Sequence, residues 1–402
     1  MTLRSGRTGV RRSLPNRAGI VLVLGAIVLS ATVVAACTPT DAPSGVSPPA
    51  EAVLPTPLES STAGPGTSWV VMPMGHLDDP TNTFWQMFYR SGTSSRWELA
   101  TPPGVASNGG LVATIGSSGT VTAGFEPSQG LLFSPLAQTA DLGATWSQGL
   151  LPGGLAPVPD ALASSGAHQF LALLRDDGGR VVTDGGGLTT WTTVTSARKL
   201  ASYPSSARCG ITGLSAVTYG TDGDPVVGTA CAHGSRPGIF ESSDGSWHSV
   251  GPPLPDTVSG PTRVIRLLDT PAGVTALVSA GKGTPHSLFA LWSADGSTWT
   301  VSAPLRLPAG PSSTGVTATG GLVVVTGGAG GRRTASIVDP SGGRWDVLPT
   351  PPGGTSAVVD GPDGTIEALI ADQSTLHVDA LDSDGWHRVQ TSGVAIQYGS
   401  SS

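Results

Sequence analysis

The chain has 402 residues, of which 57 are Gly and 34 are Pro; only 12% are charged, and the formal net charge is -7. The apolar content is normal for a globular protein, which excludes charge-driven disorder of most of the chain. Gly is far from one residue in three and has no fixed period, which excludes a collagen repeat. The negative net charge argues against a nucleic-acid-binding protein, so we expect no nucleic-acid partner.

Residues 1–36 have the composition of an export signal. Five Arg and no acidic residue occur in this segment, which ends in an apolar run and the phrase Val34-Ala35-Ala36-Cys37. The phrase resembles the lipobox of bacterial lipoproteins, which implies that residues 1–36 are removed and that acyl chains on Cys37 hold the protein at the outer face of the cell membrane. An apolar run of this length also suits a plain transmembrane anchor. Arg11 and Arg12 leave open a twin-arginine export route.

Residues 37–66 are predicted to form a disordered linker. They contain seven Pro and no aromatic residue, so they cannot bury enough apolar surface to offset the cost of ordering. Removal of residues 1–36 would take away five positive charges and no negative ones, which changes the formal charge from -7 to -12. The exported part of the chain is therefore acidic.

Residues 67–402 repeat one pattern. Seven Trp follow short phrases of small, acidic and Gly residues at spacings of 41 to 56 residues, namely Trp97, Trp146, Trp191, Trp247, Trp299, Trp345 and Trp386. Each repeat has room for three or four short strands, and no helical periodicity is visible. This pattern predicts an all-β fold, a seven-bladed β-propeller of four-stranded antiparallel blades.

The phrase from Thr139 to Trp146, TADLGATW, matches the Asp-box pattern in full, and three other phrases are shortened versions of it. The body therefore resembles the Asp-box (BNR) repeat propellers, which include sialidases, although the phrase before Trp345 also resembles a kelch blade. The resemblance implies that each box is the turn between the third and fourth strands of a blade. We expect structural roles, not catalytic ones, for Asp141, Trp146, Asp244, Trp247, Asp295, Trp299, Asp384 and Trp386.

The two ends of the repeat region suggest how the ring closes. Residues 67–97 are too few for a complete four-stranded blade, and the segment 393–399, GVAIQYG, is left over after the last repeat. We therefore predict that this C-terminal segment supplies the innermost strand of the first blade.

Two of the three Cys belong to the body of the protein. Cys209 and Cys231 flank a predicted hairpin with its turn at residues 221–224, and their midpoint is close to that turn. They are therefore predicted to face each other, and export to an oxidising compartment favours a disulfide between them over two buried thiols.

The sequence contains no recognisable catalytic, phosphate-binding or metal-binding motif, so we expect no cofactor and no metal site. The enzymatic hypothesis is a sialidase-like exo-glycosidase, which rests on the Asp-box resemblance alone. That family uses a Tyr nucleophile paired with Glu, and Arg residues that bind the substrate carboxylate. Arg90 is the Arg near the first repeat with aromatic neighbours, but the Ile-Pro of the family motif does not follow it, and no Tyr has an adjacent Glu.

The main hypothesis is a binding or scaffolding module for a cell-envelope glycan or protein, expected to be a monomer. The resemblance implies that ligands meet the face opposite the Asp-boxes, which is formed by the connections between second and third strands. A basic stretch is predicted there and offers a site for an anionic partner, unless its charges are merely solvated. Its residues are His233, Arg236, Lys282, His286, Arg332 and Arg333.

Overall fold

The structure is a computed structural model in which the chain divides into two units, Met1–Val46 and Ser47–Ser402. It describes residues between 60 and 395 of the second unit. The gaps are 63–66, 78–82, 93, 95, 103–109, 116–118, 126–134, 151–158, 166–168, 175–177, 186–189, 256–257, 259, 283–285, 309, 328–332 and 362–363. The predicted signal peptide, Cys37 and most of the predicted linker lie outside these residues. Within the described part of the chain, no helix is long and apolar enough to span a membrane.

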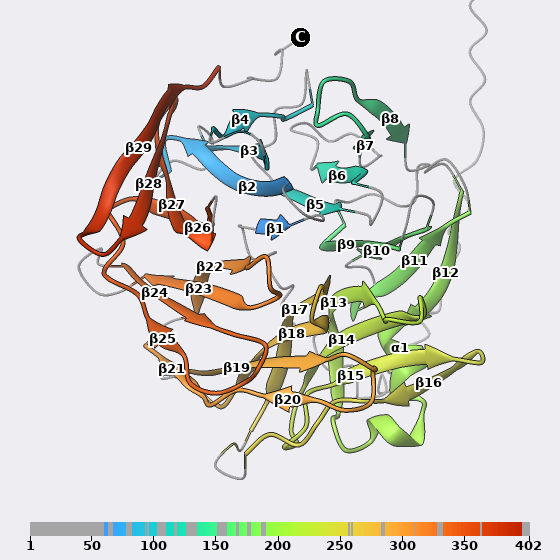
Figure 1. The fold of residues 1–402 in the computed structure, drawn as a ribbon. Helices are drawn as coiled ribbons and strands as arrows, with labels where there is room; N and C mark the ends of the chain where they lie inside the picture. The colour runs from blue at the N-terminus through green and yellow to red at the C-terminus, as the bar shows by residue number, and fades with distance from the viewer. Residues whose placement is uncertain are drawn as a thin grey trace, which may run out of the picture. The chain divides into compact units, whose positions relative to one another are not determined.

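The described residues form antiparallel sheets, which confirms the predicted all-β class (Figure 1). Group one is β1 (Ser60–Thr62), β2 (Thr67–Gly75), β3 (Thr83–Ser91) and β4 (Glu98–Leu99). Group two is β5 (Leu111–Ile115), β6 (Val121–Phe125), β7 (Pro135–Thr139) and β8 (Ser147–Leu150). Group three is β9 (Ala161–Ser165), β10 (Gln169–Leu174), β11 (Arg180–Asp184) and β12 (Trp191–Ser196).

A nine-stranded sheet comes next, and we divide it in chain order into groups four and five. Group four is β13 (Ile211–Tyr219), β14 (Pro225–Cys231), β15 (Ile239–Ser243) and β16 (Ser246–Ser249). Group five is β17 (Thr262–Thr270), β18 (Gly273–Ala280), β19 (His286–Ser293), β20 (Thr300–Val301) and β21 (Leu305–Leu307). Two short helices, α1 (Ala197–Ala201) and η3 (Pro204–Ser206), precede β13.

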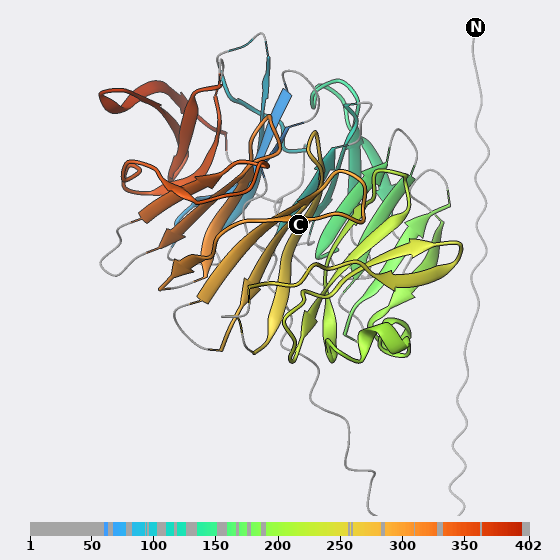
Figure 2. The same ribbon diagram turned by 60° about the horizontal axis from the view of Figure 1, so that its bottom comes forward.

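Two more four-stranded sheets complete the order. Group six is β22 (Pro311–Val316), β23 (Leu322–Gly327), β24 (Arg333–Val338) and β25 (Asp346–Val347). Group seven is β26 (Thr355–Asp360), β27 (Ile366–Asp372), β28 (Thr375–Asp382) and β29 (Gly385–Gly393). Figures 1 and 2 show the groups arranged around a centre, with the first strand of each group inside and the last strand outside.

The core consists of hydrophobic clusters that lie between neighbouring groups. In β23, Leu322 and Val324 pack in the cluster shared with group five, whereas Val323 and Val325 pack in the cluster shared with group seven. Successive side chains of a strand point to opposite faces of its sheet. Both faces of this sheet are buried, and this explains why its central strand is a continuous apolar run instead of an alternating one.

Each of the seven repeating Trp packs in a different cluster between two groups. Trp97 and Trp247 are buried, and the other five are half-buried, namely Trp146, Trp191, Trp299, Trp345 and Trp386. One cluster joins the first group to the last, with Met72 and Phe88 on one side and Val359 and Leu369 on the other. The Trp side chains therefore hold neighbouring sheets together, as the periodicity predicted.

The edge of the first sheet differs from the prediction. The inner edge of β2 pairs with β1, in the register Ser60↔Val70 to Thr62↔Ser68, so this place is not taken by the C-terminal segment. The last strand, β29, pairs with β28 at the outer edge of group seven. Residues 396–402, the remainder of the proposed closing strand, lie outside the described residues. The sheet thus begins inside the range assigned to the linker, and a three-residue strand without apolar residues carries no signal in the sequence.

Candidate functional site

The predicted basic residues lie at connections between second and third strands. His233 and Arg236 are exposed in the β14–β15 connection, and Lys282 is exposed after β18. His286 and Arg333 are the first residues of β19 and β24, and both are partly buried. Arg332 lies outside the described residues. The antiparallel order of each group places these connections on one side of the molecule, opposite the turns between third and fourth strands.

Three of these residues are brought together where groups four and five meet. The end of β14 pairs with the start of β17 in the register Ala230↔Arg263 and Cys231↔Thr262, which makes the nine-stranded sheet continuous. The Thr262 hydroxyl donates to the backbone oxygen of Arg236 at 3.4 Å. Thr262 also faces Ala280 of β18, two residues before Lys282. Backbone pairing therefore holds the loops of His233, Arg236 and Lys282 beside one another.

A disulfide between Cys209 and Cys231 joins a third segment to this region. Their Cα atoms are 4.9 Å apart, and the predicted hairpin is present with Tyr219 facing Pro225. The backbone N–H of His233 donates to the oxygen of Cys209 at 3.3 Å. Gly210 has φ +60, and a Cβ there would lie 2.5 Å from Cε1 of the His233 ring. A side chain at this position would meet the imidazole and would have to adopt a left-handed backbone conformation, which glycine adopts without strain.

The same bridge positions Arg208, a residue that the sequence analysis did not select. Its side chain is exposed, and its backbone oxygen lies 2.8 Å from where a Cβ of Gly234 would be. Arg198 and Lys199 of α1 are exposed on the same connection, which has no acidic residue between Asp184 and Asp222. This stretch of basic residues was the feature of the sequence that could have indicated Arg208. No local pattern, however, shows that the connection folds back onto β14.

The side chains of Arg236 and Arg333 differ in their surroundings. Arg236 Nη1 donates to the backbone oxygen of Gly251 at 3.0 Å, which fixes the direction of its exposed side chain. Burial lowers the pKa of the half-buried Arg333 guanidinium. Arg333 also belongs to group six, one sheet beyond the joint. The basic residues that the described structure joins into one surface are therefore Arg208, His233, Arg236 and Lys282, which we call the joint surface.

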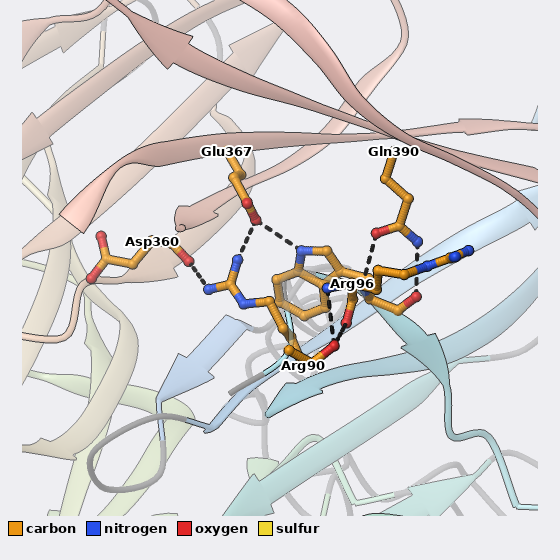
Figure 3. A network of polar contacts seen from close by, with 7 residues as sticks. Arg90, Arg96, Asp360, Glu367 and Gln390 are labelled. Carbon is orange, nitrogen blue, oxygen red and sulfur yellow. Dashed lines mark hydrogen bonds and ion pairs between the residues drawn. The ribbon is translucent and has the colours of Figure 1, made fainter. Parts of the chain in front are cut away.

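Arg90, the candidate carboxylate-binding Arg of the glycosidase hypothesis, serves a different purpose. Its side chain is buried in β3, where Nη1 donates to Glu367 Oε2 at 2.5 Å and Nη2 donates to the backbone oxygen of Asp360 at 2.6 Å (Figure 3). The guanidinium lies 4.9 Å from the centre of the Trp97 ring. The charge of Arg90 is thus already matched by the last sheet, so this residue is not available to a substrate carboxylate.

The network around Arg90 links group one to group seven through several side chains. Trp97 Nε1 donates to Glu367 Oε2 at 2.9 Å, and Gln390 of β29 both donates to and accepts from the backbone of Trp97. Burial raises the pKa of the Glu367 carboxyl, while the Trp97 N–H and Arg90 act in the opposite direction. The network satisfies buried polar groups that hydrophobic packing alone would leave unpaired.

One Tyr does have a Glu partner, which adjacency in the sequence did not reveal. The Tyr89 hydroxyl donates to Glu98 Oε2 at 2.9 Å across β3 and β4. Burial and the neighbouring Glu98 raise the pKa of Tyr89, and this makes its phenol a weaker nucleophile at neutral pH. Because alternate residues of a strand point to opposite faces, Tyr89 and Arg90 cannot act on one substrate. The pair does not reproduce a glycosidase site.

The Asp-box phrase at Asp141 forms the turn between β7 and β8. The Asp141 carboxylate accepts from the backbone N–H and the hydroxyl of Thr145, at 2.9 and 2.5 Å, and from the Thr139 hydroxyl at 2.8 Å. Gly143 has φ +85 and donates its N–H to the same Thr139 hydroxyl. These hydrogen bonds lower the pKa of Asp141. The carboxylate is occupied within its own turn, as expected for a structural role.

The other three phrases lie in equivalent turns but use their acidic residues differently. Asp295 accepts the backbone N–H groups of Ser297 and Thr298, which lowers its pKa, in the turn after β19. Asp244 has a left-handed backbone conformation, with φ 53. The N–H of Asp384 donates to Asp382 Oδ1, so the carboxylate that accepts within this turn is that of Asp382. Nothing in the described residues groups three His, Cys, Asp or Glu side chains suitably for a metal ion.

Comparison with known proteins establishes the fold. The structure is similar to putative 6-phosphogluconolactonases of Bacteroides fragilis (TM-score 0.52, 11% identity, 83% of this chain and 97% of that chain) and Bacteroides uniformis (0.51, 12%, 83% and 98%). It is also similar to the periplasmic gluconolactonase of Pseudomonas aeruginosa (0.51, 11%, 82% and 96%). These neighbours show that the fold is a β-propeller, and identities this low show the fold alone. No family model and no curated protein sequence matches the chain.

Proposed function

We propose that the protein is a lipid-anchored, extracytoplasmic β-propeller that binds a cell-envelope glycan or protein through the face formed by its second-to-third strand connections. The observation that carries this proposal is the joint surface. There, Arg208, Arg236 and Lys282 are exposed on loops held together by β14–β17 pairing and the disulfide. Among the described residues, none of these three cations pairs with a carboxylate of the protein. Exposed cations held in fixed positions suit an anionic ligand.

We further propose seven blades, with groups four and five as separate blades of the nine-stranded sheet. Two observations support this number: the hydrophobic clusters each lie between two neighbouring groups, and one of the seven repeating Trp packs in each cluster. The turns at Asp141 and Asp295 support a kinship with Asp-box propellers, because both carboxylates accept backbone N–H groups within their own turns.

The anchor is proposed from the sequence phrase that ends in Cys37. Growth with radiolabelled palmitate tests it: the full chain is expected to incorporate label and sediment with membranes. The Cys37→Ala chain should lose the label. Label that persists in this variant, or wild-type protein that carries none, would show that a different kind of anchor is used.

Binding is tested with the full chain in a non-ionic detergent, incubated with envelope fragments and recovered. We expect the wild-type protein to retain envelope material and the Arg208→Ala/Arg236→Ala/Lys282→Ala variant to retain much less. The control is Arg344→Ala, which removes an exposed cation from the opposite, third-to-fourth-strand face. Equal retention by all three proteins would move the binding face elsewhere, and no retention by the wild type would refute the binding role.

The glycosidase alternative gains no support from the structure, since Arg90 is paired with Glu367 and Tyr89 is on the other face of β3. A fluorogenic sialoside assay separates the two classes. We expect no turnover above that of a protein-free blank. Turnover by the wild type above this blank would restore the enzymatic hypothesis.

A further inference from the structure

We propose that the joint surface, Arg208, His233, Arg236 and Lys282, binds a linear acidic polysaccharide of the envelope through the polymer's carboxylate or phosphodiester groups. This inference rests on the proposed binding function and specifies the chemical class of its ligand. It assigns a binding role to Arg208, and a positioning role to the disulfide that places Arg208 there.

The backbone segments that carry the cations are held by main-chain hydrogen bonds and by the disulfide. The Cys209–Cys231 bridge follows Arg208 directly, and the N–H of Ala232 donates to the oxygen of Gly210 at 2.9 Å. On the other side, Gly281 donates its N–H to the oxygen of Pro261 at 3.0 Å, next to Lys282. Two loops and one inter-group connection therefore present their cations from a rigid base. A ligand that binds such a base does not have to order the loops first.

The local charge is opposite to that of the whole chain. The formal net charge is -7, yet the sequence has no acidic residue from 185 to 221, from 225 to 240 or from 270 to 294, the stretches that contain these cations. The connection before β17 packs on the same loops, since the N–H of Leu254 donates to the oxygen of Ser235 at 2.7 Å, and its acidic residue is Asp256, which lies outside the described residues. Arg208, Arg236 and Lys282 outnumber this one carboxylate, which leaves a local excess of positive charge. This contrast favours a ligand with several charges, because each exposed charge contact contributes little by itself.

The composition of the surface favours an acidic polymer over an acidic protein. Protein interfaces derive most of their binding energy from buried aromatic and aliphatic side chains near their centre. In the described part of the chain, the large hydrophobic side chains that are exposed are Leu77, Val347 and Val389, and none of them is in the loops of the joint surface. The loops present Gly, Ser, Pro and cations instead. Such a surface recognises spaced charges, which a repeating acidic saccharide supplies.

Direct binding of defined polymers tests the inference. The full chain in non-ionic detergent is titrated with polygalacturonate, which carries carboxylates, and with a phosphomannan, whose sugars are joined by phosphodiesters; neutral dextran is the blank. We expect at least one acidic polymer to bind, dextran not to bind, and the affinity to fall steeply with added salt. The Arg208→Ala/Arg236→Ala/Lys282→Ala variant should bind about tenfold more weakly or worse. Arg344→Ala should remain close to the wild type.

A second variant tests the positioning role of the disulfide without removing any charge. Cys209→Ser/Cys231→Ser keeps Arg208 but releases its segment from β14, so we expect weaker polymer binding with an unchanged far-ultraviolet circular dichroism spectrum. If that variant fails to fold, the Arg208→Ala variant alone tests the role of Arg208. Its affinity for the acidic polymer should fall, while that of Arg344→Ala should not.

The outcomes separate the inference from the proposed function. The inference is overturned if the triple variant still binds the polymers as the wild type does. It is also overturned if Arg344→Ala loses as much polymer affinity as the triple variant. Capture of an acidic envelope protein through the joint surface, with no affinity for either polymer, overturns the polysaccharide assignment and retains the binding face. Failure to retain any envelope material removes the proposed function itself.

Discussion

Two pairs of neighbouring sheets are held together by different kinds of contact. Groups four and five, which are consecutive in the chain, are joined by backbone pairing between β14 and β17, and a disulfide within group four lies beside this pairing. Groups one and seven, which come from the two ends of the domain, share one isolated backbone bridge, Gly75 with Gln373. Their other polar contacts come from side chains: Arg90 with Glu367, and Gln390 with the backbone of Trp97 (Figure 3). Where backbone pairing between two sheets is limited to a single bridge, directional side-chain contacts make their packing specific.

The largest expected effect breaks the junction between the two ends. Arg90→Ala leaves the Glu367 carboxylate buried without its cation, and we expect a loss of about 3–5 kcal/mol in the free energy of unfolding. Chemical denaturation measures it. The control is His387→Ala, which removes a contact with Asp382 in which the two side chains are 51% and 49% exposed, and it should cost less than about 1 kcal/mol. Equal losses in the two variants would mean that the Arg90 network does not hold the ends together.

Group four, next to its junction with group five, should respond to reductant instead. The disulfide spans a sequence separation of 22 residues, and Cys209→Ser/Cys231→Ser is expected to cost about 3 kcal/mol. Dithiothreitol should lower the melting temperature of the wild type and of Arg90→Ala alike, and leave that of the double Ser variant unchanged. Sensitivity of the double variant to reductant would indicate that another thiol contributes.

A smaller effect distinguishes the two candidate strands at the edge of β2. Deletion of the chain up to residue 66 removes β1 and the few backbone hydrogen bonds of its register, each worth about 1 kcal/mol. We expect it to lower the melting temperature more than a truncation after residue 395. The reverse order would support closure by the C-terminal segment.

The smallest effect concerns the turn that follows β19, in group five beside the same junction. Backbone N–H groups of Thr298 and Ser297 lower the pKa of Asp295, so its carboxylate stabilises the fold above its ordinary pKa, 3.8. This stabilisation is lost as the pH falls through the lowered value. Asp295→Asn should therefore be less stable than the wild type at pH 7, and the gap should narrow in acid.

Asp269 of the same group should affect the pH dependence of stability in the opposite direction. Loss of solvation raises the pKa of Asp269, although the residue is exposed at the surface, so the protonated form is favoured in the folded protein. That contribution disappears as the pH rises through the raised value. Asp269→Asn is expected to match or exceed the wild type at pH 7 and to lose this advantage in acid. Urea unfolding curves at pH 3, 5 and 7 measure both variants, and parallel trends would contradict the two assigned directions.

Local patterns predicted a large part of this molecule. The Trp spacing led to the strand groups and to the packing of each indole between sheets, and the symmetry of Cys209 and Cys231 about residue 220 led to the disulfide. The turn at Asp141 was predictable because its contacts span only four residues. Interactions between neighbours in the chain leave such signatures in the spacing of residue types.

Other features had no signature of this kind. Arg90 meets Glu367 across 277 residues, and Arg208 reaches the loop of Gly234 only because its connection folds back onto β14. The candidate site was therefore half predicted: His233, Arg236 and Lys282 were placed on the correct connections, but Arg208 was missed. Arg333 was grouped with them, although it lies one sheet away.

The amino-acid sequence alone determined the all-β class, the repeat of about 48 residues per group, the turns that form within a few residues and the pairing of the two body Cys. Only the tertiary structure decided which strand borders β2, how the first and last sheets are held together and which cations share one surface. The reason is physical. Strand periodicity and turn chemistry act over a few bonds, whereas the meeting of distant segments depends on how all the sheets pack together, which no short stretch of sequence encodes.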